Sequence, residues 1–552
     1  MTGDLPNSES TAAAPVRHVV ESLLLLAACV LIFRTFAAEG YLISTGSMAP
    51  CLLGYHRQVT CPTCSHQFAK GMSLAEAEGS ASIASTASAS VGDPQGISGT
   101  ACPNCGRTGL SVNSLPKNEG DQLMVNKHAF MLRDPHRWEV IVFRNPSDPL
   151  EAYVKRVVGL PGEKIEIQNG EVLANGVAQR KSLTSQFGTR ILVDEHAHQP
   201  APENEDWEPR WSSERDESKW SEVADGFEFD GQTKEAPIDW LEFRHWVVSG
   251  GSHLTEVPLA QWPKSLVQPS SEFTSLEYDK DKRVFAIRGA LSADERDRWL
   301  ARTDDEAFHK AVQKLYRRSH YAPISDEYGY NQRYEGVTAY RVSDVMLEFD
   351  LDQCPQAGEV VIRIAHGRTY ADCRFDFAAD VMTITLNAST KPAATIPLPS
   401  SIHSGSHQFV ASVFDGQLIV GIDGGPLGEP ILLPTSTEAP PAPWVERLAR
   451  IGAKGAAVTV RNLRLYRDVY YTPKNDAGAK QFSLDAGEYF VLGDNSPVSV
   501  DSRCWEFPGV PERSLIGKPF VVHLPSRPGR LQFGGHVTHV RVPDFSRVRY
   551  IR

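Results

Sequence analysis

The feature that most constrains this 552-residue chain is one apolar segment close to its N-terminus. Residues 19–38 supply about 20 mostly apolar positions, the length that an α-helix needs to cross a bilayer. Glu21 and Arg34 lie near its ends, where charged side chains can reach the membrane interface. Residues 1–16 are small and polar and predict a disordered tail. The sequence therefore predicts a single-pass anchor over 17–38, with a cleaved signal peptide or a buried core helix as alternatives.

The rest of the chain has the composition of a globular protein. It contains no second apolar segment of this kind, and hydrophobic and charged residues make up 41% and 22% of the sequence. The net charge of -12 argues against a nucleic-acid partner. Arg17 is the only lysine or arginine before the apolar segment, so charge alone does not define the orientation of the anchor.

Four of the nine cysteines form two C-P-x-C pairs, Cys61/Cys64 and Cys102/Cys105. Two such knuckles supply the four thiolates of a closed tetrahedral zinc site. A Ser/Ala/Gly-rich loop over 73–100 separates them. The pattern predicts a zinc-ribbon-like insertion over 55–112, with disulfides as the alternative in an extracytoplasmic location. The histidines near the knuckles, His56 and His66, are interpreted as bystanders, and the histidines of residues 194–200 as part of a loop.

Most of the remaining sequence has the pattern of β-strands, so the fold class is predicted to be mainly β. Residues 121–173 carry β-branched runs, and Asn169-Gly170 and Asn175-Gly176 are hairpin signals. Residues 336–472 alternate strands and turns and predict a β-sandwich, similar in pattern to concanavalin-like or laminin-G-like jelly rolls.

Two other regions are less regular. Residues 181–335 read as a mixed acidic insertion with one helix from Ser292 to about Arg318. Residues 531–552 read as a basic C-terminal tail.

Four short stretches resemble, in order, the sequence boxes of type I signal peptidases. They are STGSMAP (44–50), GDQLMVNK (120–127), YVKRVVGLPGE (153–163) and GDNSPVSVDSR (493–503). The resemblance implies a discontinuous β catalytic core built from residues 39–54, 113–180 and 473–530, which the two insertions interrupt.

The residue types in these stretches suit a serine–lysine dyad. A serine hydroxyl needs an adjacent base, and a lysine can serve when burial lowers its pKa. On an extended strand Val154 and Arg156 face away from Lys155, which can therefore point into an apolar interior. Without the resemblance, Ser47 would be a turn residue and Lys155 a solvated charge. The resemblance implies that Ser47 is the nucleophile and Lys155 the general base.

The resemblance also implies the supporting residues and the activity. The oxyanion donors would be the Ser47 N–H group and the Thr45 hydroxyl, Ser499 would orient Lys155, and Asp501 and Arg503 would form a supporting ion pair. Catalysis would need no cofactor. The expected activity is removal of signal peptides from secreted preproteins, at the extracytoplasmic face of the cell membrane and in contact with lipid. The alternative is a catalytically silent, membrane-anchored surface protein whose jelly roll binds carbohydrate or protein.

Overall fold

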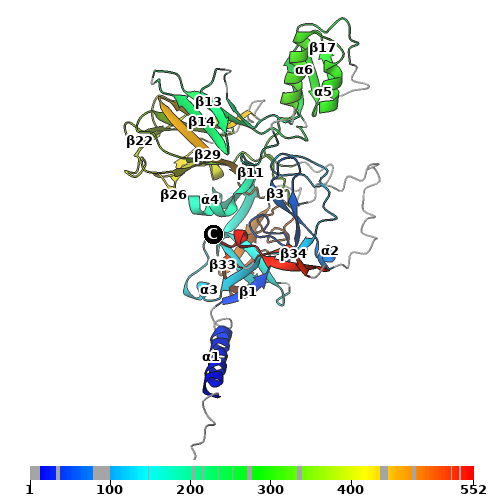
Figure 1. Ribbon diagram of the computed structural model, residues 1–552. Coiled ribbons are helices and arrows are strands. Elements are labelled where there is room, and N and C mark those ends of the chain that lie inside the picture. Colours follow the sequence, from blue (N-terminus) through cyan, green and yellow to red (C-terminus); the bar gives the residue numbers. More distant parts are fainter. Residues whose placement is uncertain are drawn as a thin grey trace, which may run out of the picture.

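Figure 1 shows the computed structural model, in which a helix, a β-rich body, a large β-sandwich and a small α/β unit follow one another from bottom to top. It describes residues 13–32, 38–78, 100–146, 148–201, 206–213, 215, 217–233, 235–251, 253–269, 276–331, 339–434, 446–474, 480–523, 525–533 and 536–551.

Helix α1 spans Ala13–Ile32 and stands away from the body of the molecule (Figure 1). It therefore begins inside the predicted tail and covers part of the predicted anchor. Residues 1–12 and 33–37 of these two segments lie outside the described residues. In the part of the chain that the structure describes, no helix combines the length and the apolarity that a membrane crossing requires.

The main sheet of the body is antiparallel and draws its strands from both ends of the chain. Its order is β1, β5, β33, β6, β7, β31 and β32, with β36 paired to β33. The strands are β1 (Ala38–Leu42), β5 (Gln122–Asn126), β6 (Val140–Arg144), β7 (Ala152–Gly159), β31 (Glu488–Leu492), β32 (Val510–Pro511), β33 (Leu515–Val522) and β36 (Arg549–Tyr550). Because β7 pairs with β31, the turn that follows β31 begins beside the strand that carries Lys155.

A smaller sheet of four strands packs into the same body. Its order is β10 (Val177–Ala178), β9 (Glu171–Ala174), β8 (Lys164–Gln168) and β30 (Gln481–Ser483). Asn169 and Gly170 join β8 to β9 with φ angles of 51° and 89°. Positive φ at both central residues is what a tight type I′ hairpin requires. The predicted hairpin is therefore confirmed.

Two antiparallel sheets enclose one hydrophobic core and form the sandwich. The first has the strands β11 (Ile191–Glu195), β13 (Trp220–Val223), β14 (Gly226–Gly231), β19 (Val345–Leu351), β24 (His407–Ser412), β25 (Gln417–Ile422), β26 (Gly425–Pro426), β27 (Ile431–Leu432) and β29 (Ala456–Arg467). The second has the strands β12 (Trp211–Ser213), β15 (Asp239–Arg244), β20 (Glu359–His366), β21 (Thr369–Asp376), β22 (Val381–Leu386), β23 (Ala394–Pro397) and β28 (Glu446–Lys454).

The sandwich does not keep to the predicted range of 336–472. The five strands between residues 191 and 244 belong to it, although the sequence assigned them to the mixed insertion. They are short and acidic, so their pattern is weak, but their aromatic side chains are buried in the sandwich core. Those side chains are Trp211, Trp220, Phe227, Phe229 and Phe243.

The predicted single helix from Ser292 to Arg318 is wrong, because two helices occupy this range. Helix α5 (Ala293–Leu300) begins after Ser292, as the capping pattern predicted. Helix α6 (Glu306–Ser319) begins after Asp305, whose side chain accepts a hydrogen bond from the Phe308 N–H group. This second cap starts a new helix. Both helices belong to a small unit with β16 (Leu254–Pro258), β17 (Leu276–Asp279) and β18 (Val284–Arg288).

The remaining elements surround the body. The cysteine knuckles lie beside a sheet of β2 (His56–Thr60), β3 (Gln67–Gly71) and β4 (Lys117–Asn118). The short helices are α2 (Leu74–Glu78), α3 (Ala129–Leu132) and α4 (Leu183–Thr189).

The prediction of a basic tail over 531–552 is wrong. Strands β34 (Ser526–Phe533) and β35 (His536–Pro543) form a hairpin, and β36 pairs with β33 of the main sheet. The alternating residues of HVTHVRVP suit a strand.

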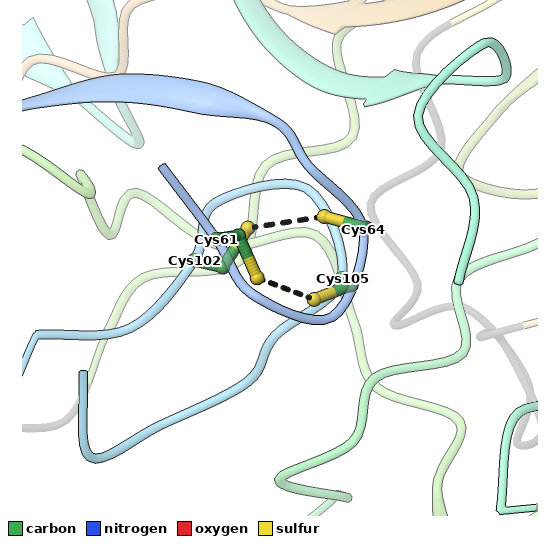
Figure 2. Close-up of side chains that lie close together, drawn as sticks. All are labelled: Cys61, Cys64, Cys102 and Cys105. Carbon is green, nitrogen blue, oxygen red and sulfur yellow. Dashed lines mark hydrogen bonds between the residues drawn. The ribbon is translucent and has the colours of Figure 1, made fainter. Parts of the chain in front are cut away.

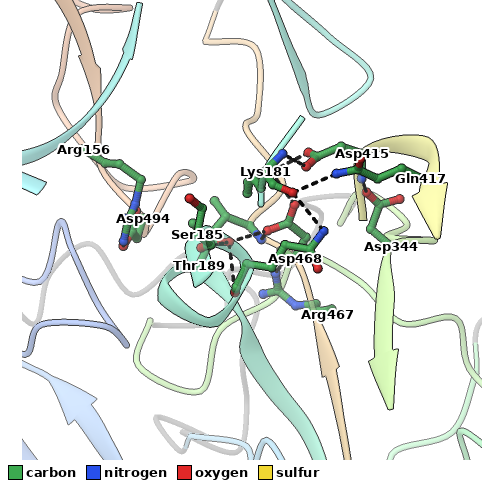
Figure 3. Close-up of polar contacts among 12 residues, drawn as sticks. Arg156, Lys181, Ser185, Thr189, Asp344, Asp415, Gln417, Arg467, Asp468 and Asp494 are labelled. Carbon is green, nitrogen blue, oxygen red and sulfur yellow. Dashed lines mark hydrogen bonds and ion pairs between the residues drawn. The ribbon is translucent and has the colours of Figure 1, made fainter. Parts of the chain in front are cut away.

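Buried charges join the body to the sandwich at Lys181, which follows β10 (Figure 3). Its Nζ lies 2.5 Å from Asp415 Oδ1 and 2.7 Å from Asp468 Oδ2, and all three side chains are buried. The same ammonium lies 4.4 Å from the centre of the Trp138 ring. The contact fixes the point at which the chain leaves the body.

Candidate functional site

Ser47 lies in the turn that follows strand β1 and is partly exposed. The buried side chains of Met48 and Ala49 hold this turn against the body. The Asn495 N–H group donates to the Ser47 carbonyl at 3.0 Å, and Asn495 Nδ2 donates to the Gly46 carbonyl at 2.9 Å. The loop of the first sequence box is therefore bound directly to the loop of the fourth.

Lys155 points into the interior from strand β7, as its alternation with its neighbours predicted. It is 4% exposed, and its Nζ donates to Ser499 Oγ at 3.3 Å. Burial lowers the pKa of Lys155 to about 8, with Asp501 opposing this change and Arg503 adding to it. About a tenth of Lys155 is therefore the neutral amine at pH 7, far more than for a lysine of ordinary pKa.

Lys155 bonds to Ser499 and not to Ser47. No hydrogen bond joins Lys155 Nζ to Ser47 Oγ, although the structure describes both residues. Catalytic hydrogen bonds often tighten only when substrate binds, so the dyad stays a prediction.

Gly493 shows how close the two loops approach. A Cβ atom at this position would lie 2.3 Å from Ser499 Oγ and 2.4 Å from the Ser47 carbonyl oxygen. Real Cβ contacts are not this short, so any side chain here would push the two loops apart. The glycine therefore brings Ser499, the partner of Lys155, against the backbone of Ser47.

Asp501 and Arg503 form a two-bond ion pair beneath this turn. Arg503 Nε lies 2.8 Å from Asp501 Oδ1, and Nη2 lies 2.6 Å from Oδ2. Burial raises the pKa of Asp501, but the hydrogen bonds and charge of Arg503 outweigh it and leave the pKa lowered. Arg503 Nη1 also donates to the Thr472 carbonyl at 2.7 Å. The pair holds the turn at Ser499 from below.

A second buried ion pair was missed by the sequence reasoning. Arg156 was expected only to face away from Lys155, but it is fully buried and makes two bonds to Asp494, at 2.7 and 2.6 Å (Figure 3). It also donates to the Gly188 carbonyl of α4 at 2.8 Å. The pair ties the strand of Lys155 to the loop of Ser499. The sequence could have indicated it, because Arg156 and Asp494 belong to the third and fourth of the four family-like stretches.

Part of the insertion also reaches the site. The Tyr328 hydroxyl donates to the Asp494 carbonyl at 2.7 Å. Asn331 and Asn495 exchange two side-chain hydrogen bonds of 2.7 Å each. No local pattern in residues 328–331 indicated this contact, because it depends on the fold of the whole insertion.

Thr45 is exposed and lies two residues before Ser47. No side-chain hydrogen bond of Thr45 is recorded in the described chain, so its role as an oxyanion donor stays a prediction.

The four cysteines of the knuckles converge, as their spacing predicted (Figure 2). The Sγ atoms of Cys61 and Cys105, and those of Cys64 and Cys102, lie 3.7 Å apart, and all four are free and buried. A disulfide needs a separation of about 2.05 Å. Zn–S bonds of about 2.3 Å in a tetrahedron place the sulfur atoms about 3.8 Å apart. The arrangement therefore fits a tetrahedral metal ion.

Comparison with known proteins gives one family. The family described as signal peptidase, peptidase S26, matches residues 110–226 and 415–524, a range that includes Lys155 and Ser499 and begins after Ser47. The "Probable signal peptidase I-2" of Synechocystis sp. is 42% identical over 62 residues, which are 10% of this chain and 28% of that protein. Signal peptidase I of Leptolyngbya laminosa is 40% identical over 75 residues, 12% of this chain and 36% of that protein. The chain thus spans about a third of the length of these relatives.

The chain was also compared with solved structures. Caenorhabditis elegans galectin LEC-6 matches with 10% identity and a TM-score of 0.18, over 22% of this chain and 81% of that chain. A TM-score this low carries no argument, so carbohydrate binding by the sandwich stays a prediction.

Proposed function

We propose that this chain, as a member of the signal peptidase, peptidase S26, family, is a serine endopeptidase. It removes signal peptides from secreted preproteins. The observation that carries the proposal is Lys155. A buried lysine with a pKa near 8, bonded to a serine that lies close to the Ser47 loop, is poised to act as a general base.

In the proposed reaction, Ser47 Oγ attacks the scissile carbonyl while neutral Lys155 accepts its proton. The Ser47 N–H group and the Thr45 hydroxyl stabilise the oxyanion. Protonated Lys155 then donates its proton to the leaving amine, which releases the mature protein and leaves the signal peptide as an ester on Ser47. Lys155 next deprotonates a water molecule, which hydrolyses the ester. Ser499, Asp501 and Arg503 position Lys155 throughout.

We also propose that residues 19–38 hold the chain in the cell membrane, with the catalytic domain on the extracytoplasmic face. The apolar composition of that segment supports this proposal. The hydrophobic part of a signal peptide enters the same bilayer. Tethering enzyme and substrate to one membrane raises their effective concentration and brings the cleavage point to Ser47.

The activity is tested by incubating the purified chain with a preprotein that carries a signal peptide. We expect a single cut at the end of the signal peptide, identified by mass spectrometry of the new N-terminus. A folded preparation that leaves several such preproteins intact would contradict the proposed function.

We further propose that Cys61, Cys64, Cys102 and Cys105 bind a structural zinc ion. The ion would take no part in the reaction, because four thiolates leave it no open position. Replacing Cys61 with Ser is expected to remove one zinc ion per chain and to lower the free energy of unfolding by about 3 kcal/mol or more. Metal analysis and thermal denaturation measure the two effects. The exposed Cys504→Ser is the control, and an unchanged zinc content in Cys61→Ser would refute the site.

A further inference from the structure

Three metal-ligating side chains from distant parts of the sequence meet beside the ribbon. His66 follows the first cysteine pair, Glu195 ends strand β11, and His198 lies in the next turn. Glu195 Oε2 lies 3.7 Å from His66 Nδ1 and 3.5 Å from His198 Nε2. All three ligand atoms lie within 4.8 Å of one another. The sequence analysis interpreted His66 as a bystander and His198 as part of a loop. It therefore did not predict this cluster, which forms only when the chain folds.

Other contacts hold Glu195 and His198 in place. Asn104, inside the second cysteine knuckle, donates from Nδ2 to the His198 carbonyl at 2.6 Å and accepts from the Glu195 N–H group at 2.9 Å. Arg464 Nε donates to Glu195 Oε1 at 2.9 Å. Because Arg464 engages Oε1, the other oxygen of Glu195 is left facing the two imidazoles. The carboxylate is therefore oriented by contacts outside the cluster, as the ligands of metal sites commonly are.

His66 contributes a buried nitrogen without a hydrogen-bond partner. Its side chain is 10% exposed, and Nδ1 makes no hydrogen bond in the described chain. Its ring lies edge-on to the ring of His198, with the two centroids 5.3 Å apart. An unsatisfied buried polar group costs about 1–3 kcal/mol, so a native structure that keeps one needs an explanation. A ligand between the three groups would supply the missing partner.

We propose that His66, Glu195 and His198 bind a second zinc ion. Zn–N and Zn–O bonds of about 2.0–2.1 Å place the ligand atoms of a tetrahedron about 3.3–3.4 Å apart. The observed separations of 3.5 and 3.7 Å exceed this by a few tenths of an ångström, which small side-chain rotations accommodate. Two imidazoles and a carboxylate suit zinc, whereas calcium and magnesium prefer sites made of oxygen.

This site differs from the cysteine cluster in its ligand atoms and in the parts of the protein that a bound ion would connect. Its three protein ligands leave a fourth position for water or another small ligand. His66 belongs to the ribbon, and Glu195 and His198 belong to the sandwich strand β11 and its turn. The ion would therefore cross-link the ribbon to the sandwich, next to the bonds that Asn104 makes.

The test is the zinc content of the full purified chain after equilibration with excess zinc and removal of loosely bound ion. His66→Gln and His198→Gln are each expected to hold one zinc ion fewer per chain than the wild type. His196→Gln is the control, because His196 lies in the same segment but outside the cluster, with its Nε2 3.6 Å from Glu222 Oε1. It is expected to keep the wild-type zinc content. An unchanged zinc content in the His66 and His198 variants overturns the proposal.

X-ray absorption at the zinc edge of the wild type gives a second readout that does not depend on how well the variants fold. We expect a mixed first shell, with nitrogen and oxygen at about 2.0–2.1 Å in addition to sulfur at about 2.3 Å. A first shell of sulfur alone overturns the proposal.

Discussion

Ser47→Ala and Lys155→Met are each expected to reduce the rate of preprotein cleavage by about 10⁴-fold or more, because nucleophile and base act as one unit. In the proposed reaction, Ser47→Ala removes the atom that forms the acyl-enzyme. Lys155→Met removes the proton acceptor while keeping a long apolar side chain in a position that is 4% exposed. Initial rates on one preprotein measure both effects. Lys164→Met, at an exposed position on β8, is the matched control and should cleave at the wild-type rate.

Lys155→Met should leave the protein folded. A loss of activity in a folded variant then identifies a catalytic role of Lys155 and not a structural one. Burial lowers the pKa of Lys155 from 10.5 to about 8, so between these values the unfolded chain binds more protons than the folded one. The charged lysine therefore destabilises the fold below pH 8, by about 3 kcal/mol at about 1.4 kcal/mol per unit. Thermal denaturation at pH 7 should find Lys155→Met at least as stable as the wild type. A stable Lys155→Met variant with a wild-type rate would show that Lys155 is not the base.

Gly493→Ala is expected to lower kcat/KM by about 100-fold or more, although the residue carries no reactive group. The added methyl group would lie 2.3 Å from Ser499 Oγ and 2.4 Å from the Ser47 carbonyl oxygen. A backbone carbonyl cannot turn aside as a flexible side chain can, so the two loops must separate. This separation would move Ser499, and with it Lys155, away from Ser47.

Steady-state kinetics on a peptide substrate measure this effect. Gly40→Ala on β1 is the control, because a Cβ there would meet only His523, at 3.7 Å. Wild-type kcat/KM in Gly493→Ala would show that the close approach of the loops does not matter for catalysis.

Several local features of the structure could be predicted from the sequence because each depends on a short pattern of residues. The alternation around Lys155 predicted its burial, and the Asn-Gly pair at 169–170 predicted its hairpin. The spacing of the cysteines predicted their convergence. In the first two cases, neighbours within a few residues determine the local structure, whereas the cysteines converge from two knuckles that are distant in the sequence.

The features that the sequence did not reveal depend on contacts between distant segments. Arg156 is next to Lys155 on its strand and therefore points to the opposite face. Its side chain is nevertheless buried, because it pairs with Asp494. Strands such as β13 and β14 are short and acidic, and only pairing with the rest of the sandwich stabilises them. Helix α6 begins after the cap residue Asp305, which was not recognised because residues 292–318 were interpreted as one continuous helix. Tyr328 reaches the Ser499 loop only after the insertion has folded.

The pH dependence of kcat/KM tests the central claim, that neutral Lys155 is the base, most directly. The pKa of about 8 predicts a rate that rises tenfold per pH unit below pH 8 and levels off above it. The wild type should be measured from pH 6 to 10 on a substrate without ionisable groups near the cut. A rate that is constant across this range, or that keeps rising to pH 10 as for a solvated lysine, would contradict the account.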